Sequence, residues 1–219
     1  MADIFVMRPR VAVLCTCGSE IAVTEQPTRD SGRSPLCASC RDAEAAESAE
    51  SALISRRALT ALVADERGYA LHRRVLPRTG TTVDHIFVGA GAVYVISDEV
   101  TPTDAEVVVE RHGGRFSPLS ETLTVDGRTR TDLVDAVRAQ CAQVAACLAE
   151  HGQADVPVVP VLSFSHAHLS RRGRNRRIAG VRLVGPTTLA DEVGADGLFD
   201  GDRRFALAMS LVARLPSAV

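Results

Sequence analysis

The strongest constraint on the fold is a run of short apolar segments that precedes one long amphipathic segment. The first three are Tyr69–Leu76, Thr82–Val88 and Ala92–Ser97, and a fourth, shorter one is Glu106–Glu110. Runs of this length, rich in β-branched residues, predict strands, and the Gly-Ala-Gly between the second and third predicts a tight hairpin turn. Apolar residues then recur at helical spacing over Thr129–His151, which predicts a long helix.

Two more extended segments follow that helix, at Val156–Phe164 and Ile178–Val184. Amphipathic patterns predict further helices over Ala52–Asp65, with Gly68 as a stop signal, and over Phe205–Leu215. A strand meander, a crossover helix and another strand together imply a mixed sheet. We therefore expect an α/β fold in which helices flank a mixed β-sheet.

Four cysteines near the N-terminus form two close pairs, which are separated by 19 residues: Cys15, Cys17, Cys37 and Cys40. Zinc prefers four tetrahedral ligands, usually from two such pairs, although the first pair here is CxC instead of the commoner CxxC. We expect a structural zinc ion in a zinc-ribbon or treble-clef-like module over residues 1–45, ahead of a second domain over residues 46–219. Unrelated reduced cysteines and a redox pair are the alternatives.

The cellular setting bears on this interpretation of the cysteines. The first residues lack a basic region followed by an apolar stretch, and no window approaches the roughly 18 uninterrupted apolar residues of a membrane span. We therefore expect a cytoplasmic protein without membrane contact. In a reducing compartment the cysteines are not expected to form disulfides.

All 25 basic residues are arginines, and the 219-residue chain contains no lysine. This excludes every mechanism that requires a lysine ammonium, such as Schiff-base chemistry or a P-loop. The formal net charge is −2, so contact with nucleic acid requires a local basic patch. One segment offers such a patch, because five of its seven residues are arginines: Arg171, Arg172, Arg174, Arg176 and Arg177. It is either a phosphate-binding loop or a solvated loop.

The chain resembles the NERD (nuclease-related domain) family along nearly its whole length. The central motif comprises Arg73–Pro77 (RRVLP), Val83–Gly89 (VDHIFVG) and Gly91–Ile96 (GAVYVI). Thr129–Gln140 resembles the long helix of the family, and Gly180–Pro186 resembles its last strand. Actinobacterial members often carry a four-cysteine module ahead of this domain. The resemblance implies a restriction-endonuclease-like fold and metal-assisted phosphodiester hydrolysis of the PD-(D/E)xK type.

The resemblance also assigns site residues, and several of them depart from the family pattern. Asp84 matches the first acid of the magnesium site and Gln140 matches the glutamine of the long helix. The second acid falls on Ser97 and the lysine position on Glu99. Strand alternation puts Ser97 and Glu99 on one face and Asp98 on the other, unless a bulge turns Asp98 inward. His85 faces away from Asp84, and Asp84 alone also suits a carboxylate that caps a strand end.

These substitutions decide the expected function. Loss of one carboxylate weakens a divalent-metal site, and an acid in place of the lysine repels both the scissile phosphate and an attacking hydroxide. We expect a NERD-like protein that binds DNA and whose nuclease site, at Asp84 and Glu99, is inactive or strongly weakened. The alternative is a non-enzymatic, zinc-containing module that binds a protein partner.

Overall fold

The computed structural model describes residues 12–14, 20–22, 39, 53–102, 104–114, 117–169, 177–185 and 187–218. The chain divides into two compact units, Met1–Ala49 and Glu50–Val219. In the first unit, β1 (Ala12–Leu14) and β2 (Glu20–Ala22) form an antiparallel pair. Among the described residues, no helix has the length and apolar character needed to cross a membrane.

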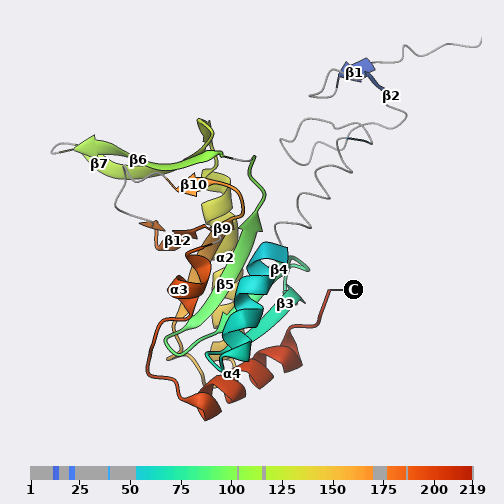
Figure 1. The fold of residues 1–219 in the computed structure, drawn as a ribbon, viewed down its shortest axis with the longest axis vertical. Coiled ribbons are helices and arrows are strands. Elements are labelled where there is room, and N and C mark those ends of the chain that lie inside the picture. The colour runs from blue at the N-terminus through green and yellow to red at the C-terminus, as the bar shows by residue number, and fades with distance from the viewer. Residues whose placement is uncertain are drawn as a thin grey trace, which may run out of the picture. The chain divides into compact units, whose positions relative to one another are not determined.

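A six-stranded mixed sheet, with strand order β11-β12-β9-β5-β4-β3, forms the centre of the second unit (Figure 1). The antiparallel strands β3, β4 and β5 form a meander, and β9 lies parallel to β5 after the crossover helix α2 (Thr131–Ala149). The sheet therefore confirms the predicted α/β class with a mixed sheet. Its strands are β3 Tyr69–Val75, β4 Thr82–Val88, β5 Val93–Glu99, β9 Val158–Phe164, β11 Arg177–Ile178 and β12 Val181–Val184.

Helices cover both faces of this sheet (Figure 1). On one face, α2 and α4 (Gly201–Arg214) pack against alternate residues of β4 and β5, among them Ile86 and Val95. On the other face, the helix over residues 53–64 and α3 (Leu189–Val193) pack against the intervening residues, such as Phe87 and Ile96. Successive residues of a strand point to opposite faces, so neighbouring positions on β4 and β5 meet different helices.

The long helix buries the apolar stripe that its sequence predicts. Its buried residues are Leu133, Val134, Val137, Cys141, Val144 and Leu148. Burial raises the pKa of the Cys141 thiol to about 12, so this cysteine is an inert apolar side chain.

A smaller four-stranded sheet, with strand order β10-β6-β7-β8, packs against the N-terminal half of α2. Its strands are β6 Glu106–Gly114, β7 Ser117–Val125, β8 Arg128–Thr129 and β10 His168–Leu169. The sequence predicted only the first part of β6 and missed β7. Leu119, Leu123 and Val125 lie at period-two positions of β7, and the last two are buried, but Glu121 interrupts the apolar series and weakens the signal.

The end of the first helix corrects one sequence expectation. The residue with left-handed backbone after this helix is Glu66, whose φ is 57°, and not Gly68. A Cβ atom at Gly68 would lie 2.4 Å from the carbonyl oxygen of Val88 and 2.5 Å from the Phe87 ring. Gly68 is therefore required by a close approach of two backbones, and not as a helix stop.

Candidate functional site

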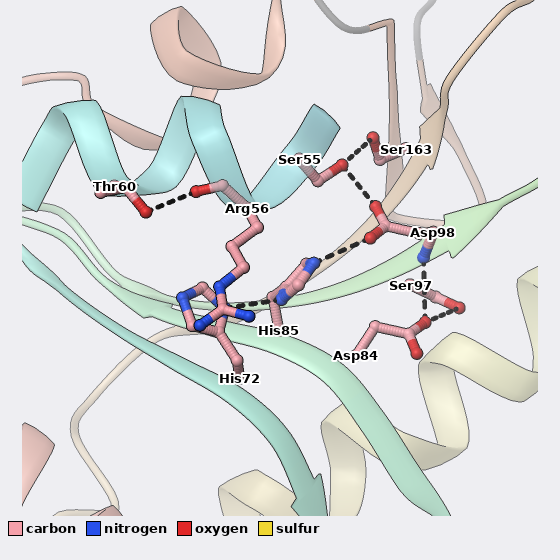
Figure 2. A network of polar contacts seen from close by, with 9 residues as sticks. All are labelled: Ser55, Arg56, Thr60, His72, Asp84, His85, Ser97, Asp98 and Ser163. Carbon is pink, nitrogen blue, oxygen red and sulfur yellow. Dashed lines mark hydrogen bonds and ion pairs between the residues drawn. The ribbon is translucent and has the colours of Figure 1, made fainter. Parts of the chain in front are cut away.

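The candidate site lies where the β4–β5 ladder ends. The last backbone pair of this ladder is His85 with Ile96. Beyond it, Asp84 on β4 faces Ser97 and Asp98 on β5. Side chains from these two strand ends lie on both faces of the sheet (Figure 2).

On the α2 face, the side chains of Asp84 and Ser97 meet. Asp84 Oδ2 accepts a hydrogen bond of 3.4 Å from the Ser97 hydroxyl and one of 3.0 Å from the Asp98 backbone N–H. The carboxylate thus substitutes for a carbonyl group at the end of the ladder. Burial raises the pKa of Asp84, while the hydrogen bond from the Asp98 backbone acts to lower it. The Asp84 carboxylate is therefore poorly solvated, and its side-chain neighbour is the Ser97 hydroxyl.

Glu99 and Gln140 also belong to this face but have other partners. Glu99 Oε2 lies 3.8 Å from a guanidinium nitrogen of Arg130, the N-cap residue of α2. Gln140 Nε2 lies 3.5 Å from the carbonyl oxygen of Thr82, and Gln140 Oε1 is buried without a hydrogen-bond partner in the described part of the chain. The groups around Asp84 are thus a hydroxyl and a backbone N–H, where the PD-(D/E)xK pattern has a second carboxylate. No three acidic, histidine or cysteine side chains within the described ranges gather closely enough to hold a metal ion.

Asp98 points to the opposite face, where the helix over residues 53–64 covers it. Its carboxylate accepts a 2.5 Å hydrogen bond from Ser55 and lies 2.8 Å from His85 Nε2. Ser55 also lies 3.1 Å from the hydroxyl of Ser163 on β9. The side chains of His85 and Asp98 are 3% and 4% exposed, so this ion pair is buried. No bulge turns Asp98 toward Asp84, and Asp98 and His85 both lie on the face that strand alternation predicts for them.

His72 on β3 extends this network toward the surface. Its Nδ1 lies 2.8 Å from His85 Nδ1, and the two rings meet edge to face (Figure 2). Partial burial, and then the charges of His85, Arg56 and Arg74, together lower the pKa of His72 to about 4, against the opposing effect of Asp98. At neutral pH, His72 is therefore uncharged.

Sequence reasoning missed this network as a unit. Strand alternation alone predicts that Asp98 and His85 share one face of the sheet, which is one part of the network. Ser55 lies 43 positions from Asp98 and 108 positions from Ser163 in the sequence. Nothing in the local sequence indicates either contact.

Several predicted residues lie outside the described part of the chain. They are Cys15, Cys17, Cys37, Cys40, Arg171, Arg172, Arg174 and Arg176. Arg177 is described, at the start of β11, and its side chain is 61% exposed. A guanidinium nitrogen of Arg177 lies 3.9 Å from a carboxylate oxygen of Glu192, and the side chain remains accessible to a ligand.

No protein-family model, curated protein or solved structure matches this chain. The resemblance to NERD domains therefore rests on the sequence motifs quoted above.

Asp84→Asn is expected to stabilise the fold at neutral pH, by roughly 1 kcal/mol, the size usual for relief of a strained functional group. Asparagine keeps an acceptor for the Asp98 N–H and removes the buried charge. The pKa of Asp84 is higher in the folded state than in the unfolded state. The charged Asp84 therefore lowers the stability of the wild-type fold at neutral pH, and this loss of stability fades as the pH falls through the folded-state pKa. Urea unfolding of both proteins at pH 7 and at progressively lower pH measures the difference. A variant less stable than wild type at pH 7 would contradict this account.

Proposed function

We propose that this chain is a catalytically silent relative of PD-(D/E)xK nucleases that binds DNA. The order of its elements supports the proposal. A helix, the meander β3-β4-β5, the crossover helix α2 and the parallel strand β9 follow one another as the resemblance to the NERD family implies. Positions 84 and 97, which that resemblance pairs as two acids, are also in contact.

The observation that carries the proposal is the separation of the carboxylates at the strand ends. Asp84 has Ser97 as its side-chain neighbour on the α2 face, whereas Asp98 is bound to His85 and Ser55 on the other face. Glu99 is paired with Arg130. Metal-assisted hydrolysis needs converging oxygen ligands and a positive group near the scissile phosphate. Here the second ligand is a neutral hydroxyl, and no lysine exists in the chain.

The arginine-rich segment is the proposed source of DNA affinity. Arginine guanidinium groups bind phosphate oxygens through pairs of hydrogen bonds, and the strength of such contacts does not depend on the base sequence. Arg177 begins β11 at the end of this segment and is exposed. The proposal therefore predicts binding that weakens steeply with salt and discriminates little between sequences.

The test is fluorescence anisotropy with labelled duplex and single-stranded DNA at several salt concentrations. The triple variant Arg171→Ser, Arg172→Ser, Arg174→Ser is expected to weaken binding to all sequences alike and to reduce the salt slope by about 0.9 for each lost contact. The matched control replaces three exposed arginines elsewhere, namely Arg57, Arg128 and Arg138, and so has the same net charge. Equal loss in both triple variants would mean that only net charge matters.

The same samples serve for a cleavage assay with magnesium and with manganese, in which wild type is expected to leave the DNA intact. Robust cleavage that Asp84→Ala abolishes would refute catalytic silence. Absence of binding to both forms of DNA would refute the DNA proposal and favour a protein partner instead.

A further inference from the structure

A second basic feature lies on the opposite face of the sheet from Asp84. Arg56 extends from the helix over residues 53–64 down to the ring of His72 on β3 (Figure 2). Arg56 is exposed, and its guanidinium makes no hydrogen bond or ion pair with the described residues. With respect to the described residues, its five N–H donors are thus open to a ligand.

The charge around His72 is not balanced. Arg56 and Arg74 both act on His72 electrostatically, in addition to the larger effect of burial. The carboxylate that acts on His72 is that of Asp98, which is 4% exposed and already bound to His85 and Ser55. The exposed end of the network is thus positive, while its negative group is buried behind it. Such an arrangement attracts anions.

The network also fixes the orientation of the His72 ring. Nδ1 of His72 lies 2.8 Å from His85 Nδ1, and His85 Nε2 lies 2.8 Å from a carboxylate oxygen of Asp98. Nε2 of His72 is consequently turned away from His85. The Arg56 guanidinium acts on the His72 ring and lies beside it, and its forked N–H donors suit a tetrahedral oxyanion.

We propose that Arg56 and His72 form a binding site for a phosphate group of the DNA backbone. This inference rests on the proposed DNA binding and extends it to a second contact point, separate from the arginine-rich segment. The site holds the phosphate and does no chemistry on it. It positions DNA along the β3 edge of the sheet, away from Asp84.

The first experiment uses inorganic phosphate as the probe, at constant ionic strength, and follows the histidine ring nitrogens by NMR. Phosphate is expected to shift the His72 signals saturably and to leave the exposed His112 unchanged. Arg56→Ser is expected to weaken this binding about tenfold or more, the size usual for a charge-assisted hydrogen bond. The control is Arg57→Ser, which removes the same charge from the next, also exposed, helix position. Arg57→Ser is expected to change the affinity less than twofold.

The second experiment measures duplex DNA binding by the same variants. Arg56→Ser is expected to weaken binding to all sequences and to lower the salt slope by about 0.9, while Arg57→Ser leaves both unchanged. DNA binding that Arg56→Ser does not alter would overturn the site and leave the proposed function standing. Phosphate binding at His72 without any DNA binding would support a phosphate site at Arg56 and His72. It would show that DNA does not supply the phosphate group, and it would refute the proposed function. Unshifted His72 signals, or equal effects of both substitutions, would overturn the site outright.

Discussion

His85→Phe is expected to lower the free energy of unfolding by about 3–5 kcal/mol, the usual result when one partner of a buried ion pair is removed. Phenylalanine fills the space of the imidazole ring but offers no nitrogen to Asp98. The Asp98 carboxylate, which is 4% exposed, then retains the Ser55 hydroxyl as its side-chain partner among the described residues. A buried charge with too few partners is costly because water no longer reaches it. Urea unfolding monitored by circular dichroism measures the loss.

A matched control is His112→Phe on β6. His112 Nε2 also lies near a carboxylate, at 3.4 Å from Glu110, but that side chain is 58% exposed. An exposed pair of this kind is worth about 0–1 kcal/mol, so the control is expected to change stability little. The double variant His85→Phe, Asp98→Leu is expected to recover much of the loss, because it removes the buried charge together with its partner. A His85→Phe loss no larger than that of the control would contradict the buried network.

This network explains how far the site was predictable. Strand alternation was enough to place Asp84 and Ser97 on one face and Asp98 and His85 on the other, since both strands are regular up to the end of their ladder. Which helix covers each face depends on packing between distant segments. The contacts of Ser55 with Asp98 and Ser163 join a helix and two strands, and no local pattern encodes them.

The same distinction holds for the fold. The meander, the long helix and the strand after it follow from periodicity. Pro160 is a subtler case, because proline disfavours a central strand and β9 lies between β5 and β12. Pairing of β9 with β12 begins at Val161, so at Pro160 β9 is flanked by β5 alone within the ladders of this sheet. The proline is tolerated because this part of the strand is still an edge on one side.

The double variant Ser97→Asp, Glu99→Lys is expected to gain metal binding and DNA cleavage, because it adds a second carboxylate and a positive group to the site. Aspartate at position 97 would place a second carboxylate beside Asp84, where the serine hydroxyl now lies 3.4 Å away. Manganese affinity, measured by calorimetry, is expected to rise at least tenfold, because hard divalent cations prefer paired carboxylates. The Glu99→Lys change replaces a repulsive group with a cation, and a single electrostatic donor of this kind is worth roughly 10²–10³ in rate. Manganese-dependent cleavage of plasmid DNA is therefore expected in the variant.

Arg130 is expected to limit the cleavage rate of the double variant, and its substitution provides a further test. It lies 3.8 Å from Glu99, so a lysine at position 99 would meet a like charge instead of a partner. Adding Arg130→Ser to the double variant is expected to increase cleavage further, since it relieves that repulsion. Adding Asp84→Ala instead is expected to abolish both metal binding and cleavage, which distinguishes the engineered site from a contaminating nuclease. If the double variant binds manganese no better than wild type, positions 84 and 97 are not the two acid positions of a PD-(D/E)xK site, and the assignment of Asp84 as the first acid falls.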